Sequence, residues 1–491
     1  MGMDEAEGLA NSRHGAMIAP AGCGKTQIVA TAVAKYGGGR ELVLTHTHAG
    51  VDALRARLVN LQVASKAYHI DTIAVLALRL AASFPRTAEL LESRPRTSAE
   101  WNGVYAGARR LLALPPIQEI IRASYSGTYV DEYQDCTEEQ HALVLGLMDV
   151  LPCRVVGDPL QGIFAFGKNA PVRWDEHVAA SFIAVPGPTR PWRWEKRDNA
   201  ELGNWLQDQR RELEAGCGIN LGQAPSSVTR LSDADFEGVR KRCFELAGRS
   251  GETVVVIRAV NAQCHEQARL LSGLFSCVEP IDCQDLFSAA EGIAGAHGFE
   301  RAAAVIEFAS TCMTETSSAL KSMKDAFLAG RSPNRNRCKH VDQLDALLAV
   351  ASGDRMIDIV AALEAIRHLP ETPSIFRREL LNEMIRALKA THLGEWPSLV
   401  DAAWEVRSRT RIMGRKLARC SVGTTLLVKG LEFDHALVLD ADALDAQNLY
   451  VAITRGARTL TVVSKEALLR PKVRRRQPGS PPKSTQMTLG F

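Results

Sequence analysis

The chain has 491 residues, of which 46% are hydrophobic and 23% are charged, and its net charge is +3. This composition excludes a disordered or fibrous protein and is typical of a globular chain of about three domains. The apolar stretches are shorter than the ~18 residues that a membrane span needs, and the acidic start Met1-Gly2-Met3-Asp4-Glu5 does not resemble a signal peptide. Eleven cysteines without a Cys-x-x-Cys pair argue against a zinc site. We therefore expect a cytoplasmic protein with reduced cysteines.

The first informative segment is Gly22-Cys23-Gly24-Lys25-Thr26, between a strand predicted at residues 16–19 and a helix predicted at residues 27–35. A glycine-rich turn that enters a helix aims its N–H groups at phosphates, while the lysine reaches the β and γ oxygens and the threonine hydroxyl binds Mg²⁺. Ala19 stands where the first glycine of such loops is expected. Cys23 is interpreted as a small filler, with a redox switch as the alternative. The segment predicts a nucleoside triphosphate site.

An acidic pair, Asp131-Glu132, follows a second apolar strand predicted at residues 128–130. Acidic pairs are common on solvated surfaces, but this one follows a buried strand and has a phosphate loop upstream to serve. Asp131 would hold the water shell of Mg²⁺, and Glu132 would polarise the attacking water. The pair predicts hydrolysis of the bound nucleotide.

The string Asp131-Glu132-Tyr133-Gln134-Asp135 resembles motif II of the UvrD/Rep/PcrA family of superfamily 1 DNA helicases, and other motifs follow in the family's order. Residues 44–50 resemble motif Ia, and residues 155–161 resemble motif III. The resemblance implies that Gln161 senses the γ-phosphate. It also implies contacts to single-stranded DNA by Thr45, His46 and His48 and by two aromatic residues after motif III, Phe164 and Phe166.

The second half of the chain continues this resemblance. Pro191-Trp192-Arg193-Trp194 is similar to motif IV, residues 258–263 to the R-x-N-A-Q segment, residues 429–433 to motif V and residues 450–456 to motif VI. By the resemblance, Arg193 and Arg455 contact the γ-phosphate, Glu432 binds the nucleotide, and Thr424 and Lys429 contact DNA.

The resemblance implies an α/β fold with two RecA-like P-loop motor domains, mainly helical insertions and a disordered C-terminal tail. It implies a nucleoid-associated, DNA-dependent ATPase that uses ATP and Mg²⁺, translocates 3′ to 5′ on single-stranded DNA and unwinds duplexes with a single-stranded tail, in repair, replication or defence.

The departures from the family pattern leave an alternative open. No glutamine precedes the phosphate loop within residues 1–13, so the adenine-reading residue of the family is absent, and motif V lacks its usual histidine and serine. A nucleotide-dependent regulatory subunit that licenses a partner nuclease, without unwinding DNA, fits these losses. The short helicase subunit of Gabija-type antiphage systems is similar in length and motif set.

The motif order predicts the domain organisation. Residues 1–75 and 120–187 would form the first motor domain, with further strands at residues 41–44, 154–156 and 181–185. Residues 76–119 would be a short insertion, with helical runs at residues 75–83 and 104–114 closed by Pro115-Pro116. Residues 188–280 and 405–470 would form the second motor domain, with strands at residues 253–257, 435–439 and 459–463. Residues 281–404 would be a helical insertion.

A series of four arginines near the end of the helical insertion is one of two basic features of the chain, and the C-terminal tail is the other. Arg407, Arg411, Arg415 and Arg419 recur every four residues, which would place them on one helical face. An anionic partner and acidic neighbours within the fold are both open as explanations.

The tail, residues 471–491, carries five basic residues and no acidic one. Its composition predicts disorder. It ends in Gln486-Met487-Thr488-Leu489-Gly490-Phe491, which resembles the peptide by which bacterial DNA-handling proteins bind the sliding clamp. Gln486, Leu489 and Phe491 would be the clamp-binding residues.

Overall fold

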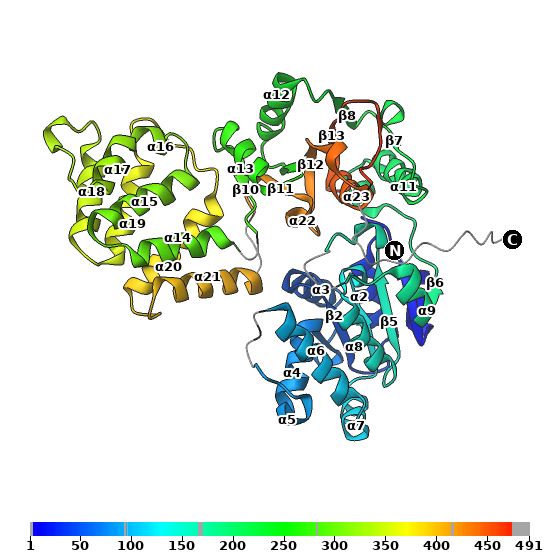
Figure 1. The fold of residues 1–491 in the computed structure, drawn as a ribbon. Helices are drawn as coiled ribbons and strands as arrows, with labels where there is room; N and C mark the ends of the chain where they lie inside the picture. The colour runs from blue at the N-terminus through cyan, green and yellow to red at the C-terminus, as the bar shows by residue number, and fades with distance from the viewer. Residues whose placement is uncertain are drawn as a thin grey trace.

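The computed structural model describes residues 3–92, 95, 97–164, 170–280, 283–413 and 417–473. The chain forms two α/β domains, each built on a six-stranded parallel sheet, and a separate group of helices (Figure 1). This is a fold of two RecA-like domains with a helical insertion. Among the described residues, no helix combines the length and apolarity needed to cross a bilayer. The C-terminal tail with Gln486, Leu489 and Phe491 lies outside the described residues.

The first domain holds the glycine-rich turn. Its sheet has the strand order β3-β2-β4-β5-β1-β6, and all its pairings are parallel. The strands are β1 His14–Ile18, β2 Glu41–Thr45, β3 Tyr68–Thr72, β4 Gly127–Val130, β5 Cys153–Gly157 and β6 Ile183–Val185. Helices α1 Met3–Asn11, α2 Lys25–Tyr36, α3 His48–Asn60, α8 Glu138–Met148 and α9 Ala179–Ser181 accompany them. Apolar side chains fill a separate core on each face of the sheet, as parallel sheets require.

A small helical insertion separates β3 from β4. It comprises α4 Ile73–Ser83, α5 Pro85–Ala88, α6 Ser98–Leu112 and α7 Pro115–Ser124. The sequence predicted that Pro115-Pro116 close a helical run. The run does end before them, because α6 ends at Leu112, but the two prolines also occupy the first turn of α7, where a missing N–H breaks no hydrogen bond. The described residues of the insertion thus form four α-helices where two were predicted.

The second domain repeats the architecture with the strand order β10-β11-β9-β12-β13-β8. Its strands are β8 Val228–Leu231, β9 Val254–Arg258, β10 Ser276–Cys277, β11 Cys420–Thr424, β12 Phe433–Val438 and β13 Gly456–Val463. Its helices are α10 Trp192–Glu195, α11 Ala200–Glu214, α12 Phe236–Ala247, α13 Asn261–Leu270, α22 Thr425–Val428 and α23 Ala446–Ile453. A small antiparallel pair, β7 Ile219–Asn220 with β14 Leu468–Leu469, completes the domain. The strands predicted from the sequence in both domains are confirmed, with ends shifted by a few residues.

The helical group is inserted between β10 and β11 and has its own apolar core (Figure 1). It comprises α14 Gln284–Gly295, α15 Gly298–Cys312, α16 Thr316–Ala319, α17 Lys321–Leu328, α18 Val341–Ser352, α19 Met356–Arg367, α20 Arg378–His392 and α21 Leu399–Met413. Its last helix, α21, contacts α3 of the first domain.

The predicted arginine face on this last helix is wrong. The α-helix ends at Met413, and Arg407 is buried in ion pairs with Glu379 and Glu383 of α20, at 2.7 and 2.8 Å. Arg419 lies beyond the helix and donates to the backbone carbonyls of Ala247, Arg249 and Glu252. The acidic neighbours that periodicity could not reveal therefore explain Arg407, and carbonyl acceptors explain Arg419. Arg415 lies outside the described residues.

Candidate nucleotide and nucleic-acid site

A cleft of about 610 Å³ lies between the two α/β domains. Its volume is within the range of small-molecule sites. The first domain contributes the glycine-rich turn and the ends of β2 and β4, and the second contributes the segments around Lys429, Glu432 and Arg455. The carboxyl ends of parallel strands meet at one edge of a sheet, which is where ligands of such folds bind.

The glycine-rich turn joins β1 to α2. Gly22 and Gly24 have φ angles of +70° and +90°, which favour glycine. A Cβ atom on Gly22 would lie 2.4 Å from the Trp194 ring, so the turn has no room for a side chain there. Lys25 and Thr26 open α2, and their N–H groups therefore have no partner within the helix. The turn is shaped to receive an anion at the helix N-terminus.

The lysine and cysteine of the turn are both buried. Lys25 donates from Nζ to the Ala19 carbonyl at 3.3 Å, which keeps its ammonium over the turn. Cys23 accepts from Gln207 at 3.4 Å, and burial raises the pKa of its thiol to about 11. A thiol that stays protonated at neutral pH reacts poorly, and this favours the filler interpretation of Cys23.

Thr26 and Asp131 fit a magnesium ion. The Thr26 hydroxyl hydrogen-bonds the buried Asp131 carboxylate, so two hard oxygen donors lie side by side in the lining of the cleft. Burial and the neighbouring Glu132 charge raise the pKa of Asp131 to about 6, a cost that a bound cation would relieve. Mg²⁺ is often held by one or two protein oxygens and keeps several waters. The described residues contain no group of three or more His, Cys, Asp or Glu that could hold a metal.

Glu132 has a strained, charged environment. Its φ angle is +57°, unusual for a residue with a side chain. Its carboxylate accepts a hydrogen bond from Gln134. Burial acts to raise the pKa of Glu132, but the positive charges of Lys25 and Lys429 outweigh it and lower the pKa. Glu132 is therefore a carboxylate at neutral pH, the form that can accept a proton from water.

Two arginines face this site from the other side of the cleft. Arg193 donates to the Thr454 carbonyl and to Glu432, both at 2.7 Å, and its buried Nε bonds to no atom of the described residues. Arg455 is also buried. Burial and the charge of Arg193 lower its pKa to about 9. Two adjacent guanidiniums with mutual repulsion are suited to bind an anion between them.

Four further residues, which we did not single out from the sequence, connect the domains. Asp158 is fully buried and forms an ion pair with Arg210 at 2.8 Å, and it also accepts from the Gln161 amide at 2.7 Å. The oxygen of that amide faces Arg455 at 3.5 Å. The Tyr450 hydroxyl accepts from the Ala21 N–H at 3.2 Å, and Lys429 forms an ion pair with Asp135. Asp135 and Asp158 belong to motifs II and III, which was the signal available in the sequence.

The residues predicted to contact DNA fall into two groups. Thr45, His46, Phe164 and Lys429 line the cleft, and the Lys429 ammonium lies 4.7 Å from the centre of the Phe164 ring. Thr424 ends β11, and His48 is the first residue of α3. Neither Thr424 nor His48 lines the cleft. Phe166 lies outside the described residues. Their contacts with DNA stay predictions.

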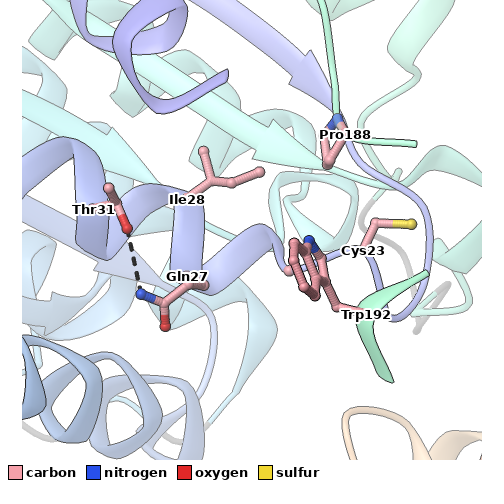
Figure 2. Close-up of a pocket in the computed structure, with 7 residues that line it drawn as sticks. Cys23, Gln27, Ile28, Thr31, Pro188 and Trp192 are labelled. Atoms are coloured by element: carbon pink, nitrogen blue, oxygen red, sulfur yellow. Dashed lines mark hydrogen bonds between the residues drawn. The ribbon is translucent and has the colours of Figure 1, made fainter. Parts of the chain in front are cut away.

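Trp192 borders the glycine-rich turn and lines both the cleft and a small pocket with Cys23, Gln27 and Thr31 (Figure 2). The Arg190 guanidinium lies 3.7 Å from the centre of the Trp192 ring system. Gln27 donates to the Thr31 hydroxyl at 3.3 Å. An indole beside a phosphate-binding turn is an available stacking surface for a base. The aromatic residue preceding Arg193 was the sequence signal that could have revealed it.

The fold and the cleft together define a two-domain P-loop architecture. No family model and no curated protein matches the chain. Among solved structures that match is a crystal structure of Pif1 helicase from Bacteroides in complex with ADP-AlF3 and ssDNA. The identity is 12%, the TM-score is 0.23, and the match covers 50% of this chain and 57% of that chain. We therefore base the function on the geometry of the cleft.

Proposed function

We propose that the chain is a DNA-dependent ATPase that binds ATP and Mg²⁺ in the cleft between its two RecA-like domains and translocates on single-stranded DNA. The carrying observation is that one cleft brings together a phosphate-binding turn, a Thr26–Asp131 oxygen pair and a Glu132 carboxylate from one domain with two arginines from the other, Arg455 buried and Arg193 partly exposed. The 3′ to 5′ direction and duplex unwinding come from the resemblance to UvrD-like helicases.

In this proposal each residue has a distinct task. The N–H groups of the turn and Lys25 hold the β and γ oxygens, and Glu132 accepts a proton from the attacking water. Arg193 and Arg455 balance the charge that develops on the transferred phosphoryl group. Thr26 and Asp131 would hold Mg²⁺, which supplies charge neutralisation at the phosphates.

The domain contacts suggest how hydrolysis is coupled to movement. Tyr450 contacts the glycine-rich turn through Ala21, and Gln161 lies between the buried Asp158 and Arg455. A phosphoryl group that binds between the turn and the arginines would compete with or rearrange these three hydrogen bonds. Nucleotide binding could therefore shift the equilibrium between two arrangements of the domains, one with these bonds and one without them.

The test is steady-state phosphate release with and without single-stranded DNA. The parent protein should be stimulated by DNA, and Glu132→Gln should bind nucleotide but lose turnover by at least about 10²-fold. Glu138→Gln, on the exposed start of α8, is the control and should match the parent. Turnover that DNA leaves unchanged, or that survives in Glu132→Gln, would contradict the proposal.

A second candidate is a nucleotide-dependent regulatory subunit for a partner nuclease. The interdomain bonds of Tyr450 and Lys429 join the two domains across the cleft, and such bonds favour a switch between closed and open domains. A strand-displacement assay separates the two functions, because the regulatory subunit would hydrolyse ATP without releasing a labelled strand.

We also propose that the C-terminal peptide binds a sliding clamp through Gln486, Leu489 and Phe491. A flexible basic linker would present two apolar anchors to a groove on the clamp. Replacing Leu489 and Phe491 by Ala should abolish recovery of the cognate clamp in a pull-down and leave the ATPase intact. Equal recovery of the clamp by both proteins would contradict this role.

A further inference from the structure

His46 lies at the hydrolytic site rather than on an outer surface. Strands β2 and β4 are parallel neighbours, with Leu44 opposite Val130. The Asp131 N–H donates to the Leu44 carbonyl at 2.9 Å, so the pairing continues past the strand ends. His46 follows Leu44 by two residues, Glu132 follows Val130 by two residues, and both line the cleft. The register therefore places an imidazole beside the proposed base.

The imidazole has an unused hydrogen-bonding atom. Nε2 of His46 is buried and has no partner among the described residues. A buried polar atom without a partner costs about 1–3 kcal/mol, so such atoms usually have a ligand or a function. The cleft that His46 lines is the one that holds the phosphate-binding turn.

The imidazole of His46 is uncharged at neutral pH. Burial and the Lys429 ammonium lower the pKa of His46 to about 4, although the Glu132 carboxylate acts in the opposite direction. The ring is therefore uncharged at neutral pH, with one nitrogen that donates and one that accepts. A neutral ring leaves the negative charge on Glu132, as a base requires.

We propose that Nε2 of His46 hydrogen-bonds the attacking water and makes His46 a further catalytic residue. This inference rests on the proposed ATPase function. The water oxygen forms the new bond to the γ-phosphorus, and the water proton passes to Glu132. The bond from the γ-phosphorus to the bridging oxygen breaks, and that oxygen keeps the electron pair. Held by both His46 and Glu132, the water would point a lone pair at phosphorus, a positioning effect that neither residue gives alone.

The experiment measures turnover without DNA, because a DNA contact would not affect it. His46→Phe keeps the ring volume and removes both nitrogens, and we expect its DNA-free kcat to fall about 10²-fold, typical of one lost hydrogen bond to a reacting group. His46→Gln carries an amide nitrogen near the Nε2 position and should recover to within about tenfold of the parent. His46→Asn, whose amide reaches only the Nδ1 position, should not recover.

Three readouts separate this role from others. Affinity for a non-hydrolysable ATP analogue and for single-stranded DNA should be unchanged in His46→Phe, and thermal melting checks that the variant folds. A DNA-free kcat within threefold of the parent, or loss of DNA affinity alone, would overturn the inference and make His46 a DNA contact. Equal losses in the Phe, Gln and Asn variants would also overturn it and indicate a packing role. Absence of turnover in the parent both with and without single-stranded DNA would instead overturn the proposed function itself.

Discussion

The turns that follow β1 and β9 differ although the two sheets share one architecture. After β1, residues 19–24 include two glycines with positive φ and lead into Lys25. After β9, the short turn at residues 259–260 contains no glycine, and the Ala259 N–H already donates to the Asp440 carboxylate at 2.8 Å. Arg258 bonds the same carboxylate at 2.8 Å. The turn after β9 is thus already bonded to a carboxylate of the chain itself, whereas the turn after β1 is the one that we propose binds a phosphate.

The two similar domains therefore differ in how the turn after a comparable strand meets an anion. In the second domain, the Asp440 carboxylate already binds the turn after β9, so this turn has a structural role. The N–H groups of the turn after β1 are instead suited to bind an anion from outside the chain. In the proposed function, the second domain acts on the ligand of the first through Arg455, which lines the cleft.

The largest expected effect concerns that arginine. Arg455→Ala should retain nucleotide binding, while kcat falls by about 10³-fold or more, because the charge on the transferred phosphoryl group loses its partner. Arg458→Ala, a nearby change at a half-exposed side chain, is the matched control. Steady-state kinetics with both variants checks this, and an Arg455→Ala rate within tenfold of the parent would mean that the second domain does not act on the phosphate.

The next prediction concerns the room for a side chain at Gly22, beside the Trp194 ring. Gly22→Ala adds a Cβ at positive φ that meets the Trp194 ring, and we expect a loss of about 4 kcal/mol in unfolding free energy together with weaker nucleotide binding. Gly394 has a φ of +74° and no atom within 4 Å of an added Cβ, so Gly394→Ala isolates backbone strain and should cost about 1 kcal/mol. Urea unfolding measures both. Equal losses would show that Trp194 yields to the methyl group.

The acidic residues near the two turns should respond to mutation with opposite signs. Because burial raises the pKa of Asp131 from 3.8 to about 6, its charge destabilises the folded metal-free protein above about pH 6, and the penalty vanishes below about pH 4. Asp131→Asn should therefore stabilise the protein at pH 8 by up to about 3 kcal/mol, and by little at pH 4. Asp440→Asn should destabilise by about 1–3 kcal/mol, since it weakens the bonds to Arg258 and Ala259. Unfolding in EDTA at both pH values checks the signs, and destabilisation by Asp131→Asn at pH 8 would contradict this assignment.

The smallest expected effect concerns the nucleobase of the bound nucleotide. Without a glutamine among residues 1–13, the first domain should hold the phosphates more specifically than the nucleobase, so kcat/KM for ATP and GTP should differ by less than about tenfold. Trp192→Ala should weaken both substrates alike, because stacking does not distinguish purines. A ratio above a hundredfold would show that another residue reads the adenine.

The sequence predicted what is determined locally. The glycine-rich turn and the apolar strands are encoded by contiguous residues, and the structure has those strands. The arginine face failed because the acids that pair with Arg407 lie on α20, a separate helix whose packing no periodicity reveals. The position of His46 beside Glu132 likewise depends on the pairing of β2 with β4, which tertiary folding sets. Asp440 was not predicted because its partners are distant in the chain.

The central claim, that only the turn after β1 binds nucleotide phosphate, is tested most directly by calorimetric titration with ATP and Mg²⁺. Glu132→Gln, which slows hydrolysis, should bind one nucleotide per chain. Adding Lys25→Ala should abolish that binding, whereas adding Arg258→Ala should leave the stoichiometry and affinity unchanged. Two nucleotides per chain, or binding that survives Lys25→Ala and is lost with Arg258→Ala, would contradict the account.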